Sequence, residues 1–240
     1  MTAARDPGTV IGTEHEPAEQ HLAYRRTRQN ITALVAGKPD VDAAGVPACP
    51  EWNVRDLVGH LVHICESFVA LEESQIDLRP SEGVGLDRLL DRWAALDGPL
   101  REALVRTPEL RRRILLLDVF SHEVDLRVCL GVPVAPAGHP AFAGALDLAT
   151  MGFGLAVHGN ELPAMRIRTP ERDWVVGEGP PTTTVRGSGF DVFRSLTGRR
   201  TWRQIERLRW SGQSSATWMR AFTWGPFTPP AAEVDPVHGT

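Results

Sequence analysis

Two acidic residues and a histidine fall on one line of a predicted helix over residues 108–130. On a helical wheel of about 100° per residue, Asp118, His122 and Asp125 lie within roughly 60° of one direction. Apolar residues border this polar line on both sides, and its other members are Ile114, Leu115 and Cys129. The opposite side of the wheel, which we expect to face solvent, carries Leu116, Phe120, Glu123 and Arg127. The polar line is therefore expected to point inward.

Burying two carboxylates and an imidazole costs several kcal/mol unless each group finds a partner, and a metal ion would provide one. Asp118 and His122 are spaced i, i+4, so both can reach one ion. His60 lies in the apolar arc of a second predicted helix and can supply a third ligand, which leaves the open fourth position typical of catalytic zinc. Asp125 can then orient His122. The alternatives are a self-satisfied Asp–His pair and a core histidine.

The composition excludes several classes of protein. The chain has 240 residues, a formal net charge of −4 and 42% hydrophobic residues, which excludes disorder and collagen. The slight acidity argues against nucleic-acid and membrane partners, and no apolar run is long enough for a membrane span. Three cysteines are an odd number in a chain large enough to fold without disulfides, which indicates reduced thiols and a cytoplasmic location. Lys38 is the only lysine among 26 cationic residues, which suggests a GC-rich source.

Periodicity predicts helices first and strands later. We expect a mobile tail over residues 1–13, then helices over 14–36, 54–74, 86–105, 108–130 and 140–158, the third bent at Gly98-Pro99. Asn53 and Asp56 form the expected N-terminal cap of the second helix. Strands are expected over 165–168, 174–176 and 182–185, a short helix over 189–196, and either structure over 205–210. Residues 226–240 are expected to be loosely ordered. The texture divides the chain into a helical domain, 14–160, and a smaller α/β domain, 161–240.

Three segments resemble the mycothiol-dependent maleylpyruvate isomerase family. They are residues 46–61 (VPACPEWNVRDLVGHL), 118–126 (DVFSHEVDL) and 185–200 (VRGSGFDVFRSLTGRR). The resemblance implies an α+β fold, with an N-terminal DinB-like four-helix bundle and a smaller C-terminal α/β domain resembling sterol carrier proteins. It also implies that His60, Asp118 and His122 bind the metal. The chain departs from the characterised isomerases at Asp118, where they have glutamate.

The resemblance further implies an enzyme that uses mycothiol with zinc or another divalent metal. The metal would hold the thiol as a nucleophilic thiolate, and the enzyme would be an isomerase or a thiol S-transferase acting on a small electrophile such as maleylpyruvate. The arginine-rich composition suits an actinobacterial source. Arg194 and Arg199 are candidate anchors for an anionic substrate or thiol; alternatively they are surface residues or pair with Asp191 and Glu206. The competing function is a non-catalytic metal-binding or small-ligand sensor. We expect a monomer or homodimer.

Overall fold

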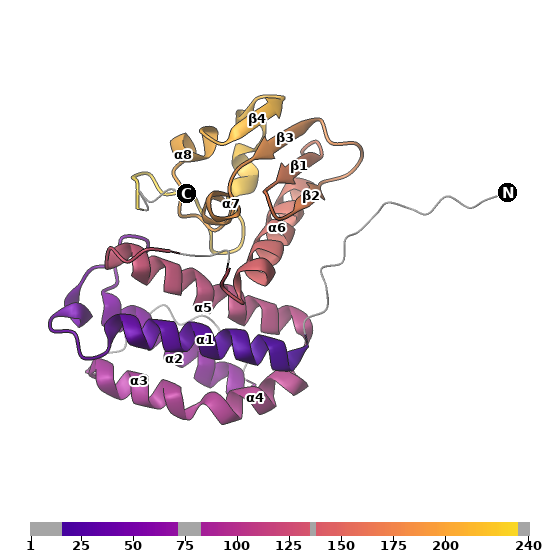
Figure 1. The fold of residues 1–240 in the computed structure, drawn as a ribbon. Coiled ribbons are helices and arrows are strands. Elements are labelled where there is room, and N and C mark those ends of the chain that lie inside the picture. The colour runs from indigo at the N-terminus through magenta and orange to yellow at the C-terminus, as the bar shows by residue number, and fades with distance from the viewer. Residues whose placement is uncertain (1–15, 72–82, 135–137, 235–240) are drawn as a thin grey trace.

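The computed structural model describes residues 16–71, 83–134 and 138–234. Its first part is helical (Figure 1). α1 packs lengthwise against α5 and also contacts α4, while α2 packs on α3, α4 and α5. The helices are α1 (Pro17–Val35), α2 (Val54–Val69), α3 (Leu86–Ala95), α4 (Asp97–Arg106) and α5 (Glu109–Cys129), with a short 3₁₀ turn η1 (Val41–Ala43) after α1. The predicted tail over residues 1–13 lies outside the described residues.

The predicted cap of α2 is confirmed. The Asn53 side chain accepts a hydrogen bond from the Asp56 amide at 2.9 Å, and the Asp56 carboxylate accepts one from the Asn53 amide at 3.2 Å. This reciprocal pair satisfies two amides that the first turn leaves without intrahelical partners. It fixes Asn53 as the residue from which α2 starts, and so sets the direction in which His60 points two turns later.

The third predicted helix is two helices, and the break is not where we expected it. α3 ends at Ala95 and α4 begins at Asp97, so the chain turns at Leu96 rather than at Gly98-Pro99. Pro99 instead lies in the first turn of α4, where backbone amides have no intrahelical acceptor. The lack of an amide hydrogen in proline therefore costs no hydrogen bond there. The turn is tied to α1 by His21, whose ring Nε2 lies 3.1 Å from the Asp97 carbonyl oxygen, and by an Arg28–Asp97 ion pair at 3.2 Å.

The second part of the chain builds a four-stranded sheet in the order β2-β1-β3-β4, with β1 and β3 parallel and both edge pairs antiparallel. The strands are β1 (Met165–Arg168), β2 (Asp173–Val176), β3 (Thr183–Arg186) and β4 (Arg209–Gly212). The helices are α6 (Phe142–Gly159), α7 (Gly189–Leu196), α8 (Trp202–Glu206) and the 3₁₀ segment η3 (Ser215–Phe222). The ambiguous stretch 205–210 thus ends a helix and begins a strand. Periodicity did not predict η3, which buries Trp218, Ala221 and Phe222.

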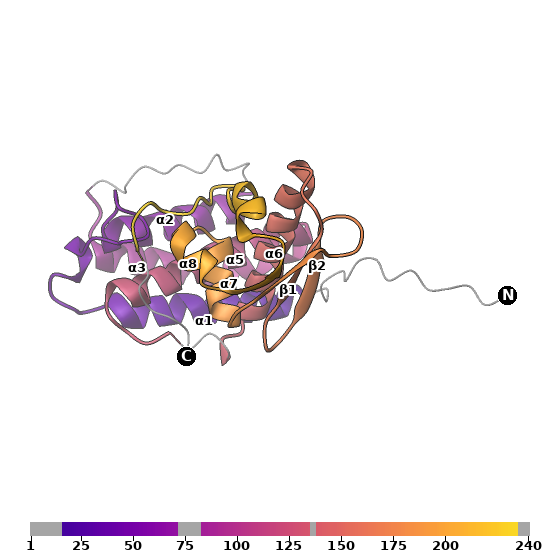
Figure 2. The same cartoon turned by 90° about the horizontal axis from the view of Figure 1, so that it is seen from above.

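α6 belongs to both parts of the molecule. It packs against α5, and it also packs against α7, β2 and η3 (Figures 1 and 2). Close packing at its middle depends on Gly152, because a Cβ atom there would overlap the ring of Trp224. The sequence pattern changes from helical to strand-like near residue 160, after α6 has ended. The contacts of α6 nevertheless join it to the C-terminal elements as well as to the N-terminal helices.

The side of α5 that we expected to face solvent is buried, so that prediction was wrong. Phe120 is 2% exposed and packs against Phe142 and Phe193, which belong to the C-terminal part. Glu123 is 1% exposed. Ile114, which the wheel placed on the inward line, is 52% exposed. The C-terminal elements cover α5 on the side away from α2, and a wheel drawn for one helix contains no information about a second covering layer.

Burial of Glu123 is compensated by three hydrogen-bond donors. Its carboxylate accepts bonds from the Asn30 amide at 3.0 Å and the Arg127 guanidinium at 2.8 Å, and it lies 3.0 Å from the Nε2 atom of His139. Burial raises the pKa of Glu123, but the hydrogen bonds from His139 and Arg127 lower it by more. The pKa of Glu123 therefore lies below its ordinary value. This cluster fastens the segment before α6 to α1 and α5.

Candidate metal site

His60, Asp118 and His122 come together between α2 and α5. The Nε2 atoms of His60 and His122 lie 3.5 Å and 3.6 Å from Asp118 Oδ1. The two imidazole rings meet edge to face with their centroids 5.3 Å apart. One ligand atom from each of the three residues lies within 4.8 Å of the other two. The structure therefore brings together the three residues that the sequence singled out.

The three residues fit a divalent metal ion. In a tetrahedral zinc site, ligand atoms about 2.0–2.1 Å from the metal lie roughly 3.3–3.4 Å from each other, close to the two observed His–Asp separations. Asp118 Oδ2 is buried and has no hydrogen-bond partner among the described residues, and the same holds for His60 Nδ1. A buried carboxylate oxygen without a donor is costly unless a cation satisfies it. Burial raises the pKa of Asp118, but the facing histidines outweigh it and the net shift is downward.

His122 is oriented by Asp125, as the spacing on α5 suggested. The His122 Nδ1 atom lies 3.1 Å from Asp125 Oδ2, one turn further along the helix. Because a carboxylate only accepts hydrogen bonds, Nδ1 is the protonated nitrogen and Nε2 keeps its lone pair for the side of Asp118. The Asp125 side chain is fully buried. It therefore holds His122 in the tautomer that a metal ligand requires.

Arg194 and Arg199 reach Asp125 from the C-terminal part of the chain. Arg194 Nη1 lies 2.8 Å from Asp125 Oδ1, and Arg199 donates through Nη2 to Oδ2 at 2.8 Å and through Nε to Oδ1 at 3.3 Å. The relative exposure is 0% for Arg194 and 8% for Arg199, so neither is the surface residue considered as an alternative. Arg200, which the sequence analysis passed over, donates to Asp191 at 3.0 Å.

The two arginines determine the electrostatics of Asp125. Burial alone raises the pKa of this carboxyl group, but the charges of Arg199 and Arg194 and the contact with His122 lower it well below its ordinary value. Asp125 is thus a carboxylate at neutral pH. One buried negative charge is shared by two guanidinium groups and a histidine, and the guanidinium groups come from residues 69 and 74 positions away in the chain.

Two further residues line the site. Trp52 lies with its ring centroid 4.9 Å from that of His60 and 6.3 Å from that of His122. Cys49 offers its sulfur within 4.8 Å of ligand atoms of His122 and Asp125. Burial, followed by the charge of Asp125, raises the pKa of the Cys49 thiol to about 12, so it is a protonated thiol at neutral pH. Both residues belong to the connector before α2, and their place just upstream of the cap is the signal that could have identified them.

None of the helices within the described residues has both the length and the apolar character that crossing a bilayer requires.

Comparison with known proteins gives two kinds of similarity. A crystal structure described as the mycothiol-dependent maleylpyruvate isomerase aligns with a TM-score of 0.53 and 13% sequence identity, covering 83% of this chain and 95% of that chain. A histidine-to-alanine mutant of that isomerase gives the same values. At this identity the likeness shows a shared fold. A comparison with curated protein sequences gave no significant match.

The family match is confined to the helical part. Residues 24–113 match the family model described as the mycothiol maleylpyruvate isomerase N-terminal domain. This segment covers most of α1, all of α2, α3 and α4, and the first turn of α5, and it includes His60. The likeness to the mycothiol maleylpyruvate isomerase N-terminal domain is thus shown for this segment, which is less than half of the chain.

Proposed function

We propose that this protein is an enzyme that depends on a divalent metal and uses mycothiol as its thiol cofactor or co-substrate. Its reaction is the isomerisation of, or S-transfer to, a small electrophile such as maleylpyruvate. The observation that carries the proposal is the convergence of His60, Asp118 and His122, at the spacing of metal ligands, next to a buried carboxylate that fixes one histidine. The family of the N-terminal segment supports mycothiol as the thiol. We further propose zinc as the ion and the cytoplasm as the location.

The protein's own residues have distinct tasks in this proposal. His60 and His122 provide two neutral nitrogen donors and Asp118 provides one negative oxygen, which leaves a fourth position for an exogenous ligand. A divalent ion at this position supplies the positive charge that keeps a bound thiol deprotonated near neutral pH. Trp52 covers the two histidine rings on one side and reduces access of water there.

The charges at the site favour an anionic substrate. With neutral histidines, the side chains of Asp118, Asp125, Arg194 and Arg199 carry two negative and two positive charges, so they cancel. A divalent ion therefore leaves an uncompensated charge of about +2, of which one thiolate balances half. A carboxylate on the substrate balances the remainder, which suits an unsaturated diacid better than a neutral electrophile. We propose that Arg199, which lies at the edge of this buried group, contributes to binding that carboxylate.

The same proposal extends to the architecture. We propose that α1, α2, the α3–α4 pair and α5 form a DinB-like four-helix bundle within a domain of residues 14–160. The region 161–240 then forms a smaller α/β domain related to sterol carrier proteins. The arrangement that supports this is a small sheet flanked by α6, α7 and η3.

The first experiment is elemental analysis of the untagged protein, purified without a metal-affinity step. We expect close to one equivalent of a divalent metal in the wild type and a loss of it in His60→Ala and His122→Ala. His63→Ala is the matched control, because His63 lies one turn along α2 and is exposed. Substoichiometric metal in the wild type, or equal metal in all four proteins, contradicts the site.

The second experiment tests the reaction. The metal-loaded protein is incubated with mycothiol and either maleylpyruvate or a panel of neutral electrophiles, and turnover is followed with and without the thiol. Thiol-dependent turnover supports an enzyme, and its preference between the two substrate classes separates isomerase from transferase. A protein that binds metal but turns over nothing in the panel is the non-catalytic binding or sensor protein instead.

A further inference from the structure

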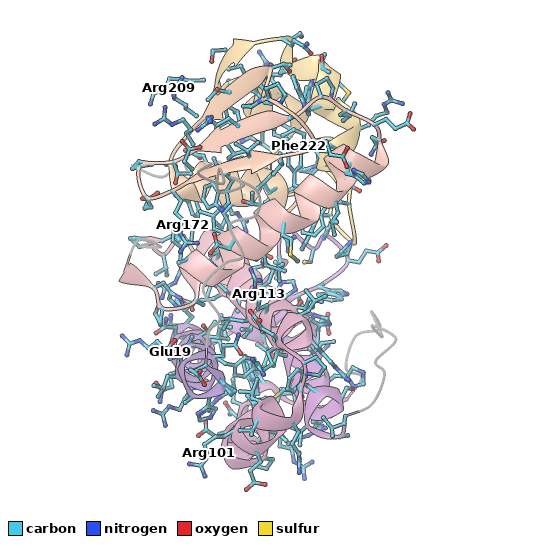
Figure 3. The ribbon with its side chains drawn as sticks, turned by 90° about the vertical axis from the view of Figure 1, so that its right-hand side faces the viewer. Glu19, Arg101, Arg113, Arg172, Arg209 and Phe222 are labelled. Carbon is cyan, nitrogen blue, oxygen red and sulfur yellow. The ribbon has the colours of Figure 1, made fainter. Side chains whose placement is uncertain are left out.

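The outer face of the C-terminal sheet carries a row of arginines. Side chains alternate between the two faces of a strand, and in β1 and β3 the inward positions are buried while the outward ones are not. Arg168 of β1 is paired with Arg186 of β3, and Arg186 is paired with Arg209 of β4. These three residues, which we name the arginine row, are all exposed. Figure 3 shows Arg209 at the outside of the sheet, away from Phe222 of the core.

The positive charge of this row is only partly compensated. Asp173 of β2 sits at one end, opposite Arg168, and binds both Arg168 and Arg166 at 3.1 Å. Within the described ranges, no carboxylate lies at ion-pair distance from Arg186 or Arg209. Like charges directly opposite each other on neighbouring strands destabilise a sheet. The row thus opposes folding stability, and it does so in a chain whose net charge is −4.

We propose that the arginine row is a docking surface for an acidic helix of a partner protein. Neighbouring strands lie about 4.8 Å apart, so the row places three guanidinium groups at roughly that spacing in a line across the sheet. Carboxylates at positions i, i+4 and i+7 of a helix are spaced by about 5–6 Å along one face. A helix lying across the strands can therefore present one carboxylate to each arginine, and the guanidinium group can bind each with two hydrogen bonds.

The composition of the face argues against nucleic acid and membrane as occupants. Its outward positions hold arginine, Asp173, Val175, Thr184 and Ser211, so the four strands offer no outward aromatic ring on which a base could stack. Val175 is the single apolar side chain at these positions, which is too little for insertion into a lipid surface.

The test uses the full chain and a labelled helical peptide that carries glutamates at i, i+4 and i+7 on one face. Fluorescence anisotropy should show binding that weakens as salt is added. The double variant Arg186→Glu with Arg209→Glu should weaken it by roughly tenfold or more, because two charged hydrogen-bonding pairs are lost. Arg101→Glu, at the far end of the molecule in Figure 3, changes an exposed arginine of α4 and should leave binding unchanged.

The fold of the double variant is checked by its thermal midpoint, which should equal or exceed that of the wild type, because the substitution at 186 places a carboxylate opposite Arg168 while the pair at 186 and 209 stays like-charged as before. The docking proposal is overturned if the peptide does not bind, or if a peptide of the same composition with its glutamates spread around the helix binds equally well. Tighter binding of a duplex DNA, or of vesicles containing phosphatidylserine, would overturn it in favour of those partners. None of these outcomes bears on the candidate metal site, which lies between α2 and α5.

Discussion

Asp125→Asn is the substitution that tests the charge balance next to the candidate metal site. In the wild type, Oδ1 of Asp125 lies 2.8 Å from Arg194, and Oδ2 lies 2.8 Å from Arg199 and 3.1 Å from His122. Asparagine has nearly the same shape, so no cavity forms. It removes the negative charge and turns one acceptor oxygen into an amino group that faces guanidinium donors. The effect is therefore electrostatic.

The expected loss of stability is large for a single isosteric change. Removing one partner from a buried ion pair costs about 3–5 kcal/mol, because the other charge is left buried without compensation. Two charge-assisted hydrogen bonds at about 1.5–3 kcal/mol each lead to a similar value. At about 2–4 °C per kcal/mol for a chain of this size, the thermal midpoint should fall by roughly 6–20 °C.

The assay is urea unfolding of the wild type and the variant at neutral pH, with equal m-values as the check that both proteins unfold in the same way. The matched control is Asp173→Asn, which also removes a carboxylate bound by two arginines but on an exposed face, and should cost less than about 1 kcal/mol. Zinc affinity, measured by competition with a chromophoric chelator, should fall about 10–100-fold in Asp125→Asn because His122 loses its orienting partner. A stability loss no larger than that of the control refutes the argument.

Three further predictions follow from the packing, the metal site and the cysteines. Gly152→Ala should destabilise the protein by about 1–3 kcal/mol in urea unfolding because its methyl group meets the Trp224 ring, while Gly159→Ala on the same helix should be close to neutral; equal effects would contradict the packing. Zinc at about 100 times its dissociation constant should raise the free energy of unfolding by about 2.7 kcal/mol in the wild type but not in His60→Ala, and an equal rise in both would place the ion elsewhere. Burial raises the pKa of the Cys65 thiol to about 11, so the folded state holds a proton that the unfolded chain loses near pH 8.5. This contribution is fully present below about pH 8.5 and is lost towards pH 11, on the order of 3 kcal/mol. Unfolding measured across this range should show a flatter profile for Cys65→Ala, and identical slopes would count against it.

The features that could be predicted from sequence are those encoded within a few residues. Asn53 and Asp56 stand three apart, and their two reciprocal hydrogen bonds involve no other part of the chain, so the start of α2 follows directly. Asp118, His122 and Asp125 share a helix face because of their spacing, and the structure keeps them together. Only the direction in which that face points depends on the rest of the molecule.

The features that could not be predicted depend on distant contacts. The wheel placed Phe120 on a solvent side because a wheel for one helix contains no information about Phe193 of α7, which packs against it. Glu123, placed on the same side, is bound by Asn30 and His139 from other parts of the chain. From the sequence, Arg194 and Arg199 could be surface residues, partners of Asp191 and Glu206, or anion anchors. Nothing in their own neighbourhood points to a carboxylate 69 and 74 positions earlier. The break at Leu96 was misplaced because proline within the first turn of a helix resembles proline at a kink.

The residues that match the family model and the residues that set the chemistry of the candidate site are largely different. The family match ends at residue 113, before Asp118 and His122, so it contains one of the three candidate ligands. Both guanidinium groups that hold Asp125 come from α7 and the turn after it, which lie over α5 (Figure 2). A shared fold at 13% identity does not by itself transfer a reaction. The charge around His122 is a property of this chain, and because it is set by the C-terminal part, the helical part alone should not reproduce the metal affinity of the whole protein.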